Sequence, residues 1–87
     1  MILIVDSGAT KSDWIALDDN GEKLFLTQTL GLSPEVLTKD VIEDRLANNF
    51  ELSKNREDVS HLFFYGAGCG TDRMKKFLKE IFKDFFP

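Results

Sequence analysis

An apolar run that ends abruptly in a polar, glycine-containing segment constrains the fold of this chain more than any other feature. The run Met1-Ile2-Leu3-Ile4-Val5 has the pattern of a strand buried on both faces. The next segment reads Asp6-Ser7-Gly8-Ala9-Thr10-Lys11-Ser12-Asp13-Trp14 and leads into further apolar residues, Ile15-Ala16-Leu17. This arrangement predicts two strands joined by a turn that carries a carboxylate, a glycine, a hydroxyl and a lysine.

These residue types are suited to binding phosphate. Gly8 lets the backbone approach a ligand closely, so that successive N–H groups can point at one anion. Thr10 adds a hydroxyl donor and Lys11 a positive charge. Asp6 ends the buried strand and is placed to hold a hydrated Mg²⁺ against the same phosphate, because Mg²⁺ usually takes only one or two carboxylates. The alternative is a hairpin turn whose polar residues bind nothing.

Residues 6–14 resemble the first phosphate motif of the actin-like ATPase superfamily, in which an apolar strand is followed by Asp-x-Gly-x-Thr and a second apolar strand. Within that superfamily the block is similar to the opening of the N-acetylglucosamine kinase branch, which is grouped with the BadF/BadG-type ATPases. The resemblance implies ATP and Mg²⁺ as cofactors, with the metal at Asp6. It implies nucleotide contacts from Asp6, Ser7, Gly8, Ala9, Thr10 and Lys11.

The strands that follow are marked by turn signals. A second strand is predicted over about 12–19, and Asn20-Gly21 predicts a tight hairpin because both residues accept positive φ. A third strand then runs over about 22–30, with Leu24, Leu26 and Leu30 on one face. The segment Gly31-Leu32-Ser33-Pro34 ends it.

Helical spacing dominates the second half of the chain. Thr38 is predicted to cap a helix with one apolar stripe, formed by Val41, Ile42, Leu46 and Phe50. A polar connection over about 53–60 leads to a strand at 62–65. Thr71 or Asp72 then caps a helix whose apolar positions are Met74, Phe77, Leu78, Ile81, Phe82 and Phe85.

This order of elements predicts an α/β fold. A three-stranded antiparallel meander, a helix, a parallel strand and a helix resemble the start of a ribonuclease H-like (actin-like ATPase) lobe. A right-handed crossover places the fourth strand beside the first, so the expected sheet order is 3-2-1-4. The resemblance implies that residues 1–87 are the N-terminal part of such a lobe. It places the fifth strand, the catalytic base and the second lobe after Pro87, so the 87-residue chain alone is expected to be inactive.

Two further loops are candidates for the sugar side of the site. Gly66-Ala67-Gly68-Cys69-Gly70 joins a strand to a helix N-terminus, which favours an anion, whereas a dinucleotide fingerprint fails because Thr71 takes its last position. The resemblance implies that Gly66 and Gly68 line the sugar side. The resembled kinases bring an Asn from the loop after strand three against the sugar, and by position Ser33 stands there in this chain. The alternatives are a tight strand-to-helix turn and a helix cap at Ser33.

Composition limits the partners. The chain has 87 residues, 43% of them hydrophobic, and a net charge of −4 without a basic stripe, which argues against nucleic acid. The single Cys69 excludes an internal disulfide framework and fits a reducing cytoplasm. No apolar run is long enough to span a membrane, and no signal segment is present. We therefore expect a cytoplasmic protein that binds neither nucleic acid nor a membrane. The resemblance implies nucleotide and a small sugar as partners, and without the fifth strand we expect self-association through an unpaired strand edge.

The resemblance implies an ATP-dependent sugar kinase that transfers the γ-phosphoryl group of Mg·ATP to a sugar hydroxyl, with N-acetylglucosamine as the sugar of the resembled branch. One alternative is a BadF-type ATPase that activates a dehydratase or reductase. That class shares an iron–sulfur cluster through cysteines, and Cys69 inside a glycine loop cannot be identified with such a ligand. The other alternative is a non-catalytic anion-binding domain.

Overall fold

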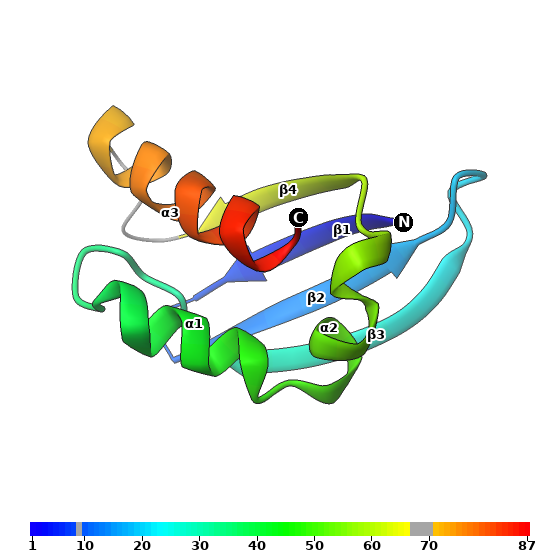
Figure 1. Ribbon diagram of the computed structural model, residues 1–87, viewed down its shortest axis with the longest axis horizontal. Helices are drawn as coiled ribbons and strands as arrows, with labels where there is room; N and C mark the ends of the chain where they lie inside the picture. The colour runs from blue at the N-terminus through cyan, green and yellow to red at the C-terminus, as the bar shows by residue number, and fades with distance from the viewer. Residues whose placement is uncertain (9, 67–70) are drawn as a thin grey trace.

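The computed structural model describes residues 1–8, 10–66 and 71–87, which form one sheet with helices on a single face (Figure 1). The strands are β1 (Ile2–Ser7), β2 (Lys11–Leu17), β3 (Lys23–Leu30) and β4 (His61–Gly66), and their order in the sheet is β3-β2-β1-β4. Strands β1, β2 and β3 pair antiparallel, whereas β4 is parallel to β1. The predicted fold class and sheet order are confirmed.

The β2–β3 turn forms where Asn20-Gly21 predicts it. Gly21 has φ of +82°, the conformation that glycine adopts without strain. The Asp18 carboxylate accepts hydrogen bonds from the Asn20 and Glu22 amides, both at 2.9 Å. Because Asp18 already initiates the turn, β2 ends at Leu17 rather than at the predicted residue 19.

The sheet buries one face. Leu3 and Val5 of β1 point toward the helices and are buried, whereas Ile2 and Ile4 on the opposite face are only half-buried. The prediction that β1 is buried on both faces is therefore wrong for the described residues, because their helices all cover the same side (Figure 1).

Trp14 lies at the centre of the core. Its side chain is fully buried, and its Nε1 donates to Thr29 Oγ1 at 3.1 Å, so the polar edge of the indole is satisfied. The ring meets Phe82 edge-on, with 6.1 Å between centroids. The rest of the buried core comes from both layers and comprises Leu3, Val5, Ala16, Leu32, Ile42, Leu46, Leu52, Leu78, Ile81, Phe85 and Phe86.

The crossover contains two helices where one was predicted. Thr38 caps α1 (Lys39–Ala47) as expected, but this helix ends before Phe50. Asn49 caps a separate helix, α2 (Phe50–Asn55), by accepting from the Leu52 amide at 2.9 Å. A 3₁₀ turn over Arg56–Asp58 completes the connection. Phe50 is consequently 71% exposed, and Leu52 takes its place in the core.

The last helix, α3 (Asp72–Phe85), follows its predicted pattern. Thr71 caps it by accepting from the Met74 amide at 3.2 Å. One face buries four apolar residues and the other exposes four lysines, which are Lys75, Lys76, Lys79 and Lys83. No helix within the described ranges is long and apolar enough to cross a membrane.

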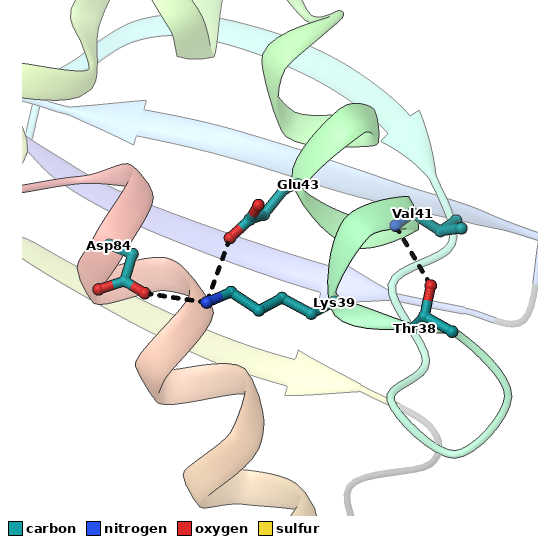
Figure 2. A network of polar contacts seen from close by, with 5 residues as sticks. All are labelled: Thr38, Lys39, Val41, Glu43 and Asp84. Carbon is teal, nitrogen blue, oxygen red and sulfur yellow. Dashed lines mark hydrogen bonds and ion pairs between the residues drawn. The ribbon is translucent and has the colours of Figure 1, made fainter.

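An exposed polar contact joins α1 to α3 (Figure 2). Lys39 Nζ lies 3.4 Å from Asp84 Oδ2 and 3.7 Å from Glu43 Oε1. The hydrogen bond to Asp84 and the negative charges of Glu43 and Asp84 raise the pKa of Lys39. Because all three side chains are partly or largely exposed to solvent, this contact contributes little to the free energy of unfolding.

Candidate functional site

The segments that the sequence predicts for the site meet at one end of the sheet, where β1, β3 and β4 end and β2 begins. Ser7 at the end of β1 pairs with Ser12 at the start of β2 and with Gly66 at the end of β4. Leu30, which ends β3, pairs with Lys11. The start and end of the β1–β2 turn, residues 31–35 and the end of β4 therefore lie together at one end of the sheet (Figure 1).

The β1–β2 turn (residues 8–10) presents its polar groups to solvent. Gly8, Thr10 and Lys11 are exposed, and the Gly8 amide donates to the Lys11 carbonyl at 2.8 Å. Gly8 has no positive φ, and a Cβ added there would only touch the Lys11 carbonyl at 3.4 Å. The fold itself therefore tolerates a side chain at this position. A side chain there would, however, prevent a ligand from approaching the backbone closely. Ala9 lies outside the described residues.

Asp6 and Ser7 point to opposite faces of β1. The Asp6 side chain is exposed on the face that the helices leave open, where its cross-strand neighbours are Asp13 on β2 and Tyr65 on β4. Gln28 Nε2 donates to Asp13 Oδ1 at 2.6 Å. The Asp6 carboxylate is thus free to meet a hydrated cation at the end of β1. Within the described part of the chain, no group of three or more metal-ligating side chains surrounds it.

Ser7 faces the helix layer, and its hydroxyl donates to the Gly8 carbonyl at 3.5 Å. The side chain is buried, and its Oγ accepts from Ser12 Oγ at 2.8 Å and from the Leu32 amide at 3.1 Å. A contact from Ser7 to a phosphate at the turn would have to come from its main chain. The nucleotide contact predicted for Ser7 stays a prediction, but its side chain makes hydrogen bonds inside the protein.

Ser33 lies beside this network and is 9% exposed. Its carbonyl accepts from the Val36 and Leu37 amides at 3.4 and 3.1 Å, which closes a turn. The Ser33 hydroxyl makes no hydrogen bond among the described residues, so the turn is not held by side-chain capping. This hydroxyl is available for a ligand.

Gly66 is required by packing. A Cβ at this position would lie 2.6 Å from the ring of Phe64 and 3.1 Å from Ser7 Cβ, closer than side chains tolerate. The glycine therefore has a structural reason apart from any ligand. The other predicted sugar-side glycine, Gly68, lies outside the described residues.

The variant Gly66→Ala is expected to lower the free energy of unfolding by about 1–3 kcal/mol, the usual effect of overpacking. Gly8→Ala is the matched control and should change stability by less than about 0.5 kcal/mol, as for surface positions. Urea unfolding of both variants measures the difference. Equal effects would contradict this account of the two glycines.

A groove on the described part of the chain lies apart from the turn. It has a volume of about 740 Å³ and runs between β4 and α3, with Leu62, Phe64, Leu78 and Phe82 among its apolar lining and Lys79 at its rim. Among the described strands, β4 pairs only with β1, so its other edge is open. An open edge favours pairing with another strand. Self-association through this edge stays a prediction.

Three residues that organise the site were not predicted as site residues from the sequence. Ser12 and Asp13 lie within the recognised block, where strand alternation sends one to each face of β2. Arg45 on α1 donates to the Gly31 carbonyl. The alternation was readable from the sequence, whereas the contact from Arg45 depends on how the crossover packs.

The chain is similar along its whole length to a solved structure, that of the putative N-acetylglucosamine kinase from Porphyromonas gingivalis. The TM-score is 0.86 at 32% sequence identity, and the match covers 100% of this chain and 31% of that chain. The chain matches the N-terminal part of that protein and has the fold of an actin-like ATPase lobe. No protein-family model and no curated protein sequence matches it.

Proposed function

We propose that this chain is the N-terminal part of an ATP-dependent sugar kinase that transfers the γ-phosphoryl group of Mg·ATP to a sugar hydroxyl. Similarity to the Porphyromonas gingivalis protein along the entire chain supports this proposal. Because the chain spans only 31% of that protein, we assign the catalytic base and the adenosine pocket to polypeptide outside these 87 residues. We call that polypeptide together with this chain the longer kinase.

One observation carries the proposal. The exposed β1–β2 turn is hydrogen-bonded directly to the segment that contains Ser33, through the Gly31 amide and the Thr10 carbonyl at 3.0 Å. A group suited to phosphate therefore lies on a segment adjacent to the Ser33 hydroxyl, which has no hydrogen bond among the described residues and is suited to a sugar. Phosphoryl transfer needs this proximity, since catalysis there rests on positioning and charge stabilisation.

The residues in and beside the β1–β2 turn would each make a different contact with the phosphates. Asp6 would hold the metal through its exposed carboxylate, and Lys11 would place its charge against the phosphate oxygens. Thr10 would supply a hydroxyl donor, and Gly8, whose own amide donates to the Lys11 carbonyl, would let the phosphate approach the backbone closely. When bound, Mg²⁺ neutralises charge on the transferred phosphoryl group. The exposure of Gly8 and of Asp6 to solvent is consistent with such a group.

The acceptor is proposed to be N-acetylglucosamine or a related sugar. The solved relative carries that sugar in its name, and the free Ser33 hydroxyl is a suitable hydrogen-bonding partner for a sugar hydroxyl. Gly66 and Gly68 would line the same side. Serine is shorter than the asparagine that the resemblance implies here, so the sugar would lie closer to the backbone of residues 31–35.

A coupled ADP assay tests the proposed function. The 87-residue chain alone is expected to show no sugar-dependent ADP formation, because it supplies groups from only one side of the reaction. The longer kinase is expected to form ADP only when N-acetylglucosamine or a related sugar is present. Sugar-independent ADP formation would favour an activator-type ATPase, and sugar-dependent turnover by the short chain would contradict the assignment of the base.

A further inference from the structure

The segment after β3 is fixed to the β1–β2 turn by successive backbone groups. The Gly31 amide donates to the Thr10 carbonyl at 3.0 Å, and the next amide, that of Leu32, donates to Ser7 Oγ at 3.1 Å. Ser12 Oγ donates to the same Ser7 oxygen at 2.8 Å. Two hydroxyl groups thus connect the ends of β1 and β2 to residues 31–35.

This connection lies in the protein interior. Ser7, Ser12 and Leu32 are at most 3% exposed, so the Leu32 amide depends on Ser7 for its hydrogen bond. On the other side of the segment, Arg45 of α1 donates to the Gly31 carbonyl. Residues 31 and 32 are therefore held between the turn and the helix layer, and Ser33 follows directly.

We propose that the Ser7–Ser12 hydroxyl pair positions residues 31–35 relative to the β1–β2 turn, so that the Ser33 hydroxyl keeps a fixed place beside an anion bound at the turn. The inference rests on the proposed function. Neither serine touches substrate in this account, so both are positioning residues. Their effect on the reaction would come through alignment of acceptor and phosphate, to which transfer reactions are sensitive.

Amide hydrogen exchange of the 87-residue chain tests whether Ser7 holds residues 31–35 in place. In Ser7→Ala the Leu32 amide is expected to exchange at least about tenfold faster, while the amides of Val5 and Ile42 keep their protection. Ser60→Ala is the matched control, because it removes a serine hydroxyl that bonds to Met1 at the opposite end of β1. It should leave Leu32 unchanged, and Ser7→Thr should restore protection.

Titration with inorganic phosphate tests the coupling. In the wild-type chain, phosphate is expected to shift the Thr10 and Lys11 amides and, through the hydrogen bonds, the Ser33 amide. In Ser7→Ala the Thr10 shift should stay and the Ser33 shift should fall at least about twofold. Ser12→Ala leaves the Ser7 acceptor in place, so it should reduce the Ser33 shift less. This variant replaces Ser7→Ala in the titration if Ser7→Ala does not fold.

The outcomes separate this inference from the proposed function. Unchanged Leu32 exchange in Ser7→Ala, or a Ser33 shift of wild-type size in that variant, would overturn the inference. If phosphate shifts no amide of the turn in the wild-type chain, the proposed phosphate site fails. The exchange of Leu32 then decides by itself whether Ser7 positions the segment.

Discussion

Replacing Trp14 with alanine is expected to leave the chain largely unfolded at room temperature. The indole is fully buried, meets the rings of Phe82 and Phe86, and bonds to Thr29. Removing a large aromatic side chain from a core costs about 3–5 kcal/mol. The free energy of unfolding of native proteins is only about 5–15 kcal/mol, and a chain of this size lies toward the lower end of that range. Circular dichroism with urea unfolding measures the loss.

Phe50→Ala is the matched control for this prediction. It removes an aromatic ring that the sequence pattern predicts in the core, but that the structure leaves 71% exposed, with Lys54 Nζ 5.6 Å from the ring centroid. Its effect should stay within about 0.5 kcal/mol. If the two variants shift the urea midpoint equally, Trp14 is not the centre of the core.

In the longer kinase, Asp6→Asn is expected to lower turnover about 100-fold or more, because the charge stabilisation supplied by a bound metal amounts to several kcal/mol. The KM for the sugar should change little. Asp6 points to the face of β1 opposite Ser7, and it is Ser7 that contacts the segment carrying Ser33. Steady-state kinetics with saturating Mg·ATP separates the two parameters.

Asp19→Asn provides the control for charge. This residue is exposed in the β2–β3 turn, at the opposite end of the sheet. Its substitution removes one carboxylate charge, as Asp6→Asn does. Turnover should be unaffected. A variant Asp6→Asn that raises the KM for sugar while keeping turnover would count against a metal role for Asp6.

Local signals in the sequence were sufficient for most of the fold. Gly21 supplies the positive φ of the β2–β3 turn, whereas Asn20 has no positive φ, and Thr38 and Thr71 cap the helices that they precede. Each of these features depends on neighbours within four residues. The order of the strands followed from a general rule of folds, the right-handedness of crossover connections, which needs no knowledge of individual long-range contacts.

The helix break and the buried serine pair depend on distant contacts. Asn49 Nδ2 donates to Thr27 Oγ1 and to the Gln28 carbonyl, at 2.8 and 2.9 Å, which anchors the start of α2 to β3. A helix continuing through Asn49 would lose these bonds, so tertiary structure overrides the periodic pattern that placed Phe50 on the stripe. For the same reason, strand alternation indicates that Ser7 faces inward but not that Leu32 is its partner.

The central claim is that the β1–β2 turn binds nucleotide phosphate, and an NMR titration of the 87-residue chain with Mg·ATP tests it most directly. We expect the amides of Gly8, Thr10 and Lys11 to shift first, with weak affinity because the proposed adenosine pocket lies outside the chain. Lys11→Met should weaken the response, whereas Lys54→Met, at an exposed site on α2, should not. Shifts confined to residues 66–71, with residues 6–12 unaffected, would contradict the claim.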